Sequence, residues 1–369
     1  MEKNLFVDSL GVFNTIMMAL SLLPLASSLF ALALPPSLLV PSPSPLAYCD
    51  KTCSTSADCG GACNNCLCAG TCGLNFCCCE GSTRGSKGTL EKGKPIRVAL
   101  YRGKGDSVRG QHNTQIVLDY EGSGIEVENV TADVIQNGLN RSKYDVVFFP
   151  GGGGRSQSNA LGETGRENVR KFIAMGGGYI GVCAGAYLAL GHSELNISGA
   201  YAEVTYHGKS SRGDGNASVT LTADGVTAFK PYNVSALQVQ TQNLFYANGP
   251  TMKFTGAATR DSEAKALMNF SSDSVPIEKH YVGPTAGKGL LAVIHHRYSL
   301  IDYYSHHGIS IPDNFDHTEA VANAGRVLLS GPHPETDQDD FEDRDGPPAA
   351  PTDVRAKILQ AYVKLVAPR

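Results

Sequence analysis

The sequence predicts an α/β protein with a doubly wound, mostly parallel sheet and a strand-rich insertion, preceded by a small disulfide-rich module. From residue 96 onward, short apolar runs alternate with segments of helical periodicity, which is typical of a parallel sheet with helical crossovers. Ten of the eleven cysteines lie between Cys49 and Cys79, which indicates a separate module. The 369 residues are enough to bury a sizeable core.

The first half of the main domain contains the clearest strand and helix signals. Short apolar or β-branched runs predict four strands, at residues 96–101, 125–130, 144–149 and 179–182. Helical patterns lie between them, at residues 112–120 and 163–175. Because strands alternate with helices, the strands are expected to pair in parallel and to gather their carboxyl ends at one edge of the sheet.

The second half differs in pattern. Residues 197–270 contain runs that alternate in polarity, such as 217–222 and 237–241, and they predict an antiparallel insertion or an edge extension of the sheet. Residues 290–295 and 326–329 predict two further strands. The domain boundaries expected from these shifts are 1–47 for a leader and Pro/Ser spacer, 48–80 for the Cys-rich module, 81–95 for a linker, 96–336 for the main domain, 337–351 for an acidic, Pro-rich linker and 352–369 for a C-terminal helix.

The N-terminal segment predicts export. Residues 11–40 are almost uncharged and rich in leucine and alanine, as in a signal peptide or a membrane anchor. Small residues at 31–33 suit signal-peptide cleavage, so a cleaved signal and a secreted, extracellular protein are the preferred prediction. An uncleaved anchor is the alternative, and it is the only membrane contact that the sequence predicts.

The Cys-rich module is too small to fold around an apolar core. Its even number of cysteines predicts disulfide bonds formed in an oxidising compartment, although the pairing cannot be read from sequence. Thiolate metal clusters are the alternative in a reducing compartment. The module could bind a surface or a carbohydrate, or simply stabilise the chain. The one cysteine outside it is Cys183.

Asn-x-Ser/Thr triplets also fit export and predict a glycoprotein. If the chain passes through the secretory pathway, these acceptors are expected on the exposed surface. There are six, at Asn129, Asn140, Asn196, Asn216, Asn233 and Asn269.

Several partner classes are not predicted. The formal net charge of -4 gives no electrostatic support for nucleic-acid binding. The glycine run at 151–154 lacks the Lys-Ser/Thr ending of a phosphate loop, so no nucleotide is expected. Adjacent histidines on a strand point to opposite faces, so neither His295–His296 nor His306–His307 predicts a metal site. No cofactor is expected.

Two motifs supply the residue types of a cysteine-dependent acyl-transfer site. Gly-Val-Cys-Ala-Gly occupies residues 181–185, and Gly-Pro-His-Pro-Glu follows 150 residues later at 331–335. Cys183 falls at a strand-to-helix elbow, and Gly181 and Gly185 are expected to let that turn close. The amino end of the following helix and an imidazole would favour the Cys183 thiolate.

The remaining roles follow from this placement. His333 is expected to hold the thiol proton, and Glu335 to orient the imidazole. The oxyanion of an acyl-transfer intermediate needs two backbone donors, for which the N–H groups of Gly152 and Ala184 are the candidates.

The longer strings around these motifs resemble a known group. Gly-Gly-Tyr-Ile-Gly-Val-Cys-Ala-Gly-Ala-Tyr and Leu-Leu-Ser-Gly-Pro-His-Pro-Glu are similar to the class I glutamine amidotransferase superfamily, and within it to the domain at the N-terminus of fungal biotin-protein ligases. The resemblance covers about residues 96–336. It implies a flavodoxin-like fold with a triad of Cys183, His333 and Glu335. Biotin transfer is not implied, because the chain has no Trp and no Gly-Arg-Gly-Arg loop.

The function expected from the residues and the resemblance is that of a secreted cysteine-dependent, amidotransferase-like hydrolase. Its substrate would be a small-molecule or peptide amide, such as a γ-glutamyl-type amide. Ammonia transfer is less expected, because this chain contains no synthetase domain. A peptidase-like relative would use the same Cys-His pair. The alternative from another class is a non-catalytic extracellular binding protein that retains the fold.

Overall fold

The computed structural model describes residues 47–49, 66–67, 77–79, 93–120, 122–191, 194–199, 201–204, 213–232, 234, 242–255, 264–271, 290–336 and 354–368. The expected leader, nearly all of the first linker and all of the acidic linker lie outside these residues. The pairing of the module's cysteines depends on side chains that are not described. The backbone of the module contributes a three-stranded antiparallel sheet in the order β1-β3-β2, formed by β1 (Ala47–Cys49), β2 (Cys66–Leu67) and β3 (Cys77–Cys79).

One half of the large sheet is parallel. Its strands follow the order β5-β4-β6-β7-β14, which is the 2-1-3-4-5 order of flavodoxin-like folds. Their bounds are β4 (Ile96–Tyr101), β5 (Ile125–Val130), β6 (Val146–Phe149), β7 (Gly178–Val182) and β14 (Gly325–Ser330). Mostly apolar sequence suits β4, β6, β7 and β14, because helices cover the sheet on both faces. Strand β5 lies at the edge of the sheet, and its sequence alternates between apolar and polar residues.

The other half is antiparallel, so the prediction of a mostly parallel sheet is wrong for the sheet as a whole. Beyond β14 the order continues β13-β12-β9-β10, and β11 joins β8 to β13. The strands are β8 (Ala202–Val204), β9 (Asp214–Leu221), β10 (Gln242–Ala247), β11 (Met252–Phe254), β12 (Lys265–Phe270) and β13 (Leu291–Tyr298). The predicted insertion therefore extends the sheet at its β14 side.

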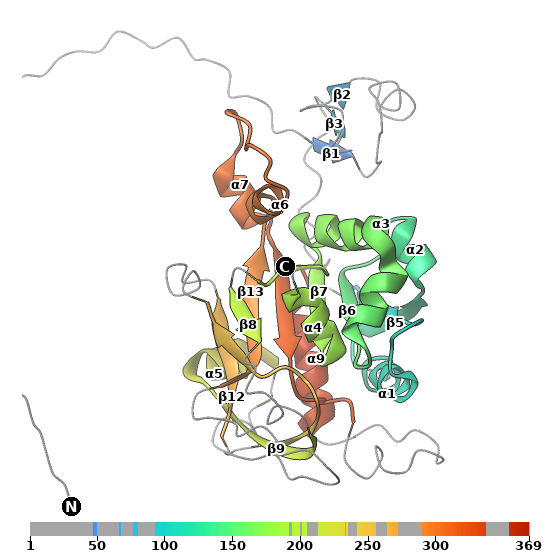
Figure 1. Cartoon of the computed structure of the whole chain (residues 1–369), viewed down its shortest axis with the longest axis vertical. Helices are drawn as coiled ribbons and strands as arrows, with labels where there is room; N and C mark the ends of the chain where they lie inside the picture. Colours follow the sequence, from blue (N-terminus) through green and yellow to red (C-terminus); the bar gives the residue numbers. More distant parts are fainter. Residues whose placement is uncertain are drawn as a thin grey trace, which may run out of the picture. The chain divides into compact units, whose positions relative to one another are not determined.

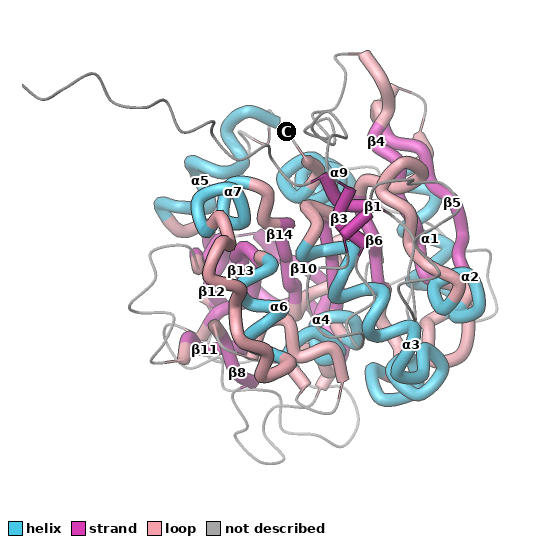
Figure 2. The backbone as a smooth tube through the Cα atoms, turned by 90° about the horizontal axis from the view of Figure 1, so that it is seen from above, coloured by secondary structure: helices cyan, strands magenta, loops and turns pink. Residues whose placement is uncertain are grey.

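Helices cover both faces of the large sheet (Figures 1 and 2). An apolar core lies on each face. One face packs against α1 (Val108–Leu118), α5 (Ala223–Phe229) and α9 (Val354–Val366). A short 3-10 helix, Lys230–Tyr232, follows α5. The opposite face packs against α2 (Ala132–Gln136), α3 (Gly154–Ala174), α4 (Ala184–Leu190), α6 (Leu300–His306) and α7 (His317–Ala322). The protein is therefore doubly wound.

Local chemistry explains two helix boundaries that differ from the prediction. Helix α1 begins at Val108, earlier than expected, because the Ser107 side chain caps it by accepting a hydrogen bond from the N–H of Gly110 at 3.2 Å. Helix α3 begins at Gly154 rather than near residue 163. Its first half is polar and is separated from the rest by Gly162, which has a φ of 60°.

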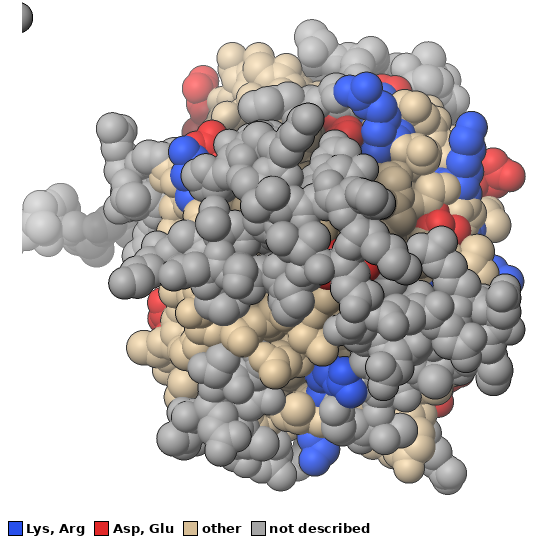
Figure 3. All heavy atoms as spheres, turned by 60° about the horizontal axis from the view of Figure 1, so that its bottom comes forward, with Lys and Arg blue, Asp and Glu red and all other residues tan. Residues whose placement is uncertain are grey.

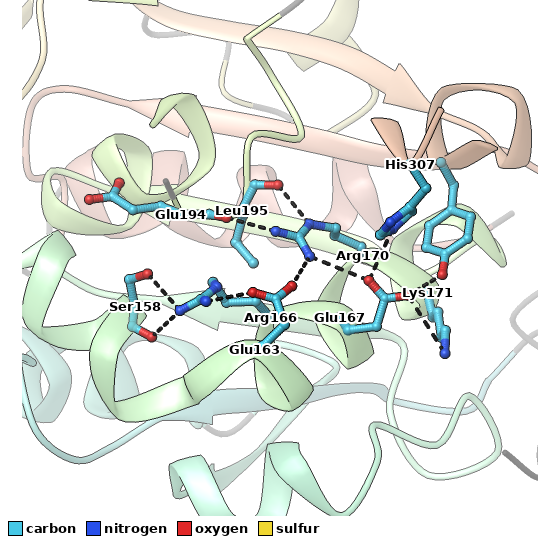
Figure 4. A network of polar contacts seen from close by, with 10 residues as sticks. Ser158, Glu163, Arg166, Glu167, Arg170, Lys171, Glu194, Leu195 and His307 are labelled. Atoms are coloured by element: carbon cyan, nitrogen blue, oxygen red, sulfur yellow. Dashed lines mark hydrogen bonds and ion pairs between the residues drawn. The ribbon is translucent and has the colours of Figure 1, made fainter. Parts of the chain in front are cut away.

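A polar network attaches α3 to α6 and to the segment after α4 (Figure 4). The buried Arg170 guanidinium donates to the carbonyl of Leu195 at 3.0 Å and to that of Glu194 at 2.8 Å, and it pairs with Glu163 at 3.0 Å. Glu167 accepts the Tyr303 hydroxyl and pairs with His307 at 3.1 Å. His306 and His307 thus belong to the end of a helix rather than to a strand.

On the face shown in Figure 3, the described Lys and Arg side chains are scattered among acidic ones and form no continuous basic area. No described helix has the length and apolar character needed to span a membrane.

The pair His295–His296 lies in β13, where the two imidazoles face opposite sides of the sheet. His296 is fully buried between Ser198 Oγ at 2.7 Å and the carbonyl of Arg297 at 2.8 Å. Burial lowers its pKa to about 4. Burial, together with neighbouring positive groups, lowers the pKa of His295 to about 3. Both rings therefore stay neutral in the folded protein at pH values where they are protonated in the unfolded chain.

Because of these two histidines, we expect the free energy of unfolding to fall at acidic pH. Between pH 7 and pH 5 the unfolded state takes up protons that the folded state refuses, so each histidine should lower the free energy of unfolding by up to about 2 kcal/mol. Urea unfolding at both pH values should show a smaller loss in His295→Gln. His112→Gln is the matched control, because His112 is exposed, and its loss should equal that of the wild type. An unchanged loss in His295→Gln would contradict the assignment.

Candidate active site

Cys183 lies at the tight turn between β7 and α4. Its backbone has φ 50° and ψ −100°, a conformation that costs a residue with a side chain roughly 1–3 kcal/mol. The turn closes only around glycine: a Cβ on Gly181 would lie 2.4 Å from the Gly185 carbonyl oxygen, and one on Gly185 would lie 2.2 Å from that of Phe149. The Tyr179 hydroxyl donates to the Gly185 carbonyl at 2.7 Å and braces the same turn. The structure therefore explains both glycines of the motif.

His333 reaches Cys183 because β14 is the parallel neighbour of β7. Ser330, at the end of β14, pairs with Val182, and the Ser330 carbonyl accepts the N–H of Cys183 at 2.8 Å. The chain then turns, and His333 follows three residues later. The carboxyl ends of adjacent parallel strands meet at the same edge, which is where sites assemble in open α/β sheets.

His333 and Glu335 form a buried pair. Nδ1 of His333 lies 2.7 Å from Oε1 of Glu335, and the two residues are only 8% and 0% exposed. The carboxylate can fix the imidazole tautomer with the proton on Nδ1 and leave Nε2 for other chemistry. The second carboxylate oxygen, Oε2, is buried and has no hydrogen-bond partner among the described residues.

The imidazole of His333 is held on two sides. Gly151 lies so close that a Cβ there would be 2.7 Å from Cε1 of the ring. On another side the Phe245 ring is tilted against the imidazole, with 6.0 Å between ring centroids. Sequence reasoning did not assign either contact. A run of glycines such as residues 151–154 is typical of a backbone that another group approaches closely, but it does not indicate which group.

Charge also distinguishes His333. Burial alone would lower the pKa of its imidazole, but the Glu335 carboxylate and the Cys183 sulfur outweigh burial and raise that pKa well above its ordinary value. The sulfur is close enough to act on the ring, yet Nε2 makes no well-aligned hydrogen bond to a described residue. The Cys183 thiol instead donates to the carbonyl of Ala247 at 3.4 Å. Loose alignment of this kind is common in catalytic groups before substrate binds.

The N–H groups of the two oxyanion candidates have no hydrogen-bond acceptor among the described residues. Gly152 bridges to Asp106, while the flanking bonds run from Ser107 to Gly151 and from Gly153 to Gly105. In an antiparallel bridge with this pattern of flanking bonds, the N–H of Gly152 points away from the segment that contains Asp106. Ala184 is the first residue of α4, so its N–H has no acceptor one turn earlier in the helix.

The glycosylation acceptors differ in exposure. Two are exposed, Asn140 and Asn216, and three are half-buried, Asn129, Asn196 and Asn269. The Asn129 amide also donates to Gln115 at 2.9 Å. The expected surface position is therefore found for only two of these five, because the others lie in or beside packed elements. Asn233 lies outside the described residues.

The described part of the chain contains no group of three or more His, Cys, Asp or Glu side chains arranged to hold a metal ion. The fully buried pair of Ser198 and His296 has the residue types of a nucleophile and a base. It lies in the core on the α3 side of the sheet and has no exposed surface, so it serves packing.

Replacing Gly151 with Ala should displace the His333 ring while leaving Cys183 in place. We expect the alkylation rate of Cys183 by iodoacetamide at pH 6 to fall roughly 10- to 100-fold, since small misplacements of a catalytic group have effects of this size. Gly153→Ala is the matched control, because its Cβ would be 3.4 Å from Ser156 Oγ and its φ of −118° suits any residue. Equal rates in the two variants would show that the close approach of Gly151 is irrelevant.

A family model described as "Biotin-protein ligase, N terminal" matches residues 96–300, more than half of the chain. Cys183 lies within the match, whereas His333 and Glu335 lie beyond it. The search of curated proteins found no match.

Solved structures with similar folds include a ThuA-like protein from Bacteroides uniformis, at 10% identity and a TM-score of 0.43, covering 73% of this chain and 92% of that one. Another is a glutamine amido transferase from Methylobacillus flagellatus, at 12% identity and a TM-score of 0.36, covering 74% of this chain and 92% of that one. The family match is what identifies the chain: it belongs to the biotin-protein ligase N-terminal family.

Proposed function

We propose that this protein is a secreted cysteine-dependent hydrolase, amidotransferase-like in fold, that cleaves an amide or γ-glutamyl-type bond. The observation that carries the proposal is the 2.7 Å bond from His333 to Glu335, buried beside the strained nucleophile position Cys183. A carboxylate that orients an imidazole next to a thiol is the arrangement of a catalytic triad. Membership of the family supports the assignment of Cys183, which lies in the matched region.

In the proposed reaction the thiol proton passes to Nε2 of His333, and the Cys183 sulfur attacks the amide carbon. The oxygen of the tetrahedral intermediate accepts hydrogen bonds from the N–H groups of Gly152 and Ala184. The carbon–nitrogen bond then breaks, and Nε2 gives its proton to the leaving nitrogen. A water molecule, deprotonated by the same imidazole, hydrolyses the thioester and restores the thiol.

Glu335 supports both steps without taking up a proton. Its carboxylate stabilises the imidazolium that forms when His333 takes up the thiol proton. The raised pKa of His333 fits this role, because the charged ring then persists to higher pH beside a thiolate.

Export is part of the proposal. The apolar segment at residues 11–40 and the cluster of ten cysteines favour the secretory pathway, and the exposed Asn140 and Asn216 could accept glycans there. The substrate would then be a small-molecule or peptide amide outside the cell.

A non-catalytic binding protein is the second candidate. The observation that favours it is the resting position of the thiol, which is 6% exposed and donates to Ala247 rather than to His333. A buried, neutral thiol in that position would be inert. The two candidates differ in the reactivity of Cys183.

Alkylation of Cys183 by iodoacetamide as a function of pH tests the proposal. If His333 supports a thiolate, the wild type should react at pH 6, where ordinary thiols are protonated, roughly 100-fold faster than His333→Ala. At pH 9 the two should converge, because thiols then ionise without help. Glu335→Gln should react at an intermediate rate at pH 6. Mass spectrometry of the peptide that contains Cys183 identifies the site, and equal pH profiles would favour the binding protein.

A further inference from the structure

Among the strands that the structure describes, β10 lies at the end of the large sheet and forms a ladder only with β9. Tyr246 pairs with Gly215 in this ladder, and the N–H of Asn248 donates to the carbonyl of Gly213 at 2.9 Å. Peptide groups of alternate residues in a strand point to opposite edges. The even-numbered residues therefore face β9, and the carbonyls of Phe245 and Ala247 face the other edge.

Both of these carbonyls contact the candidate catalytic residues. The Phe245 carbonyl accepts the backbone N–H of His333 at 2.7 Å, which makes an isolated antiparallel bridge between the two residues. The Ala247 carbonyl accepts the Cys183 thiol at 3.4 Å. One edge of one strand thus touches both the nucleophile and the base. The bridge also joins β10 to the end of β14, so the antiparallel half of the sheet closes at His333.

We infer that β10, which comes from the strand-rich insertion, completes the active site, and that Phe245 is the positioning residue for His333. The inference rests on the proposed function, and it extends that function to a residue outside the triad. Phe245 acts on His333 through two contacts, its carbonyl on the backbone N–H and its ring against the imidazole at 6.0 Å.

The need for such a residue follows from the local structure. His333 belongs to a short turn beyond β14, and a turn fixes side-chain direction less firmly than a ladder with two partners. Glu335 is only two residues away and belongs to the same turn, so its bond to Nδ1 cannot by itself fix the imidazole relative to Cys183. The buried Phe245 ring and Gly151 lie outside this turn, so their contacts with the imidazole can fix its position relative to Cys183.

The Ala247 carbonyl has a related effect on the thiol. A carbonyl oxygen accepts a hydrogen bond from S–H but repels a thiolate, so this contact opposes the ionisation of Cys183 that His333 favours. When substrate arrives, the sulfur must turn from Ala247 toward Nε2 of His333. A correctly placed imidazole is required for that transfer, which makes the position of the His333 ring decisive for reactivity.

The test compares Phe245→Leu and Phe245→Ala with Phe229→Leu in the full-length protein. Phe229 is equally buried in the core on the α9 side, where it pairs with Tyr362 at 5.9 Å between ring centroids, and it makes no ring contact with His333. For each variant the alkylation rate of Cys183 is measured with iodoacetamide from pH 5 to pH 9, and urea unfolding gives the stability. Phe245→Leu keeps an apolar side chain, so it remains informative if Phe245→Ala does not fold.

We expect Phe245→Leu to react roughly 10-fold more slowly than the wild type at pH 6 and at nearly the same rate at pH 9, because only the imidazole-dependent reaction suffers. Phe229→Leu should lose stability but keep the wild-type pH profile. A wild-type profile in folded Phe245→Leu, or the same change of profile in Phe229→Leu, would overturn the positioning role alone. If the wild type itself reacts independently of His333, the proposed function fails, and the inference fails with it.

Discussion

The parallel pairing of β7 with β14 is the constraint on which the rest of the site depends. It brings the end of the strand before Cys183 beside the end of the strand before His333, although most of the antiparallel insertion lies between them in the chain. The bond from the Cys183 N–H to the Ser330 carbonyl joins the two ends directly. This pairing sets the backbone positions of Cys183 and His333. The direction of each of the two side chains is then set by a different part of the molecule.

The strained backbone of Cys183 sets the direction of its thiol, whereas packing contacts set the direction of the His333 imidazole. Gly181 and Gly185 let the elbow close, so Cys183 takes a positive φ that points its side chain out of the sheet edge. His333 is held by Glu335, by the close approach of Gly151 and by the edge of β10. The buried charges of His333 and Glu335 are tolerated because they pair, since an unpaired buried charge would be costly. The insertion therefore contributes residues to the site as well as extending the sheet.

The sequence predicted the parts of this arrangement that depend on local patterns. Strand β5 has its predicted bounds, β14 differs by one residue at each end, and the glycines around Cys183 indicated the elbow. It did not predict the start of α3, because a polar first turn and the break at Gly162 hide the helical period. Nor could it predict the role of Phe245 or the order in which the antiparallel strands pair. Those depend on which strand edges meet, and pairing between distant segments leaves no periodic signal in either one.

The proposed mechanism depends on coupling of the charge of His333 to Cys183 and to Glu335. Nuclear magnetic resonance titration of the His333 ring nitrogens, before and after alkylation of Cys183, measures that coupling without any substrate. We expect an imidazole with a pKa well above the ordinary value in the free protein, and a fall in that pKa once alkylation removes the thiolate. An imidazole that titrates near the ordinary value and does not respond to alkylation would contradict this mechanism.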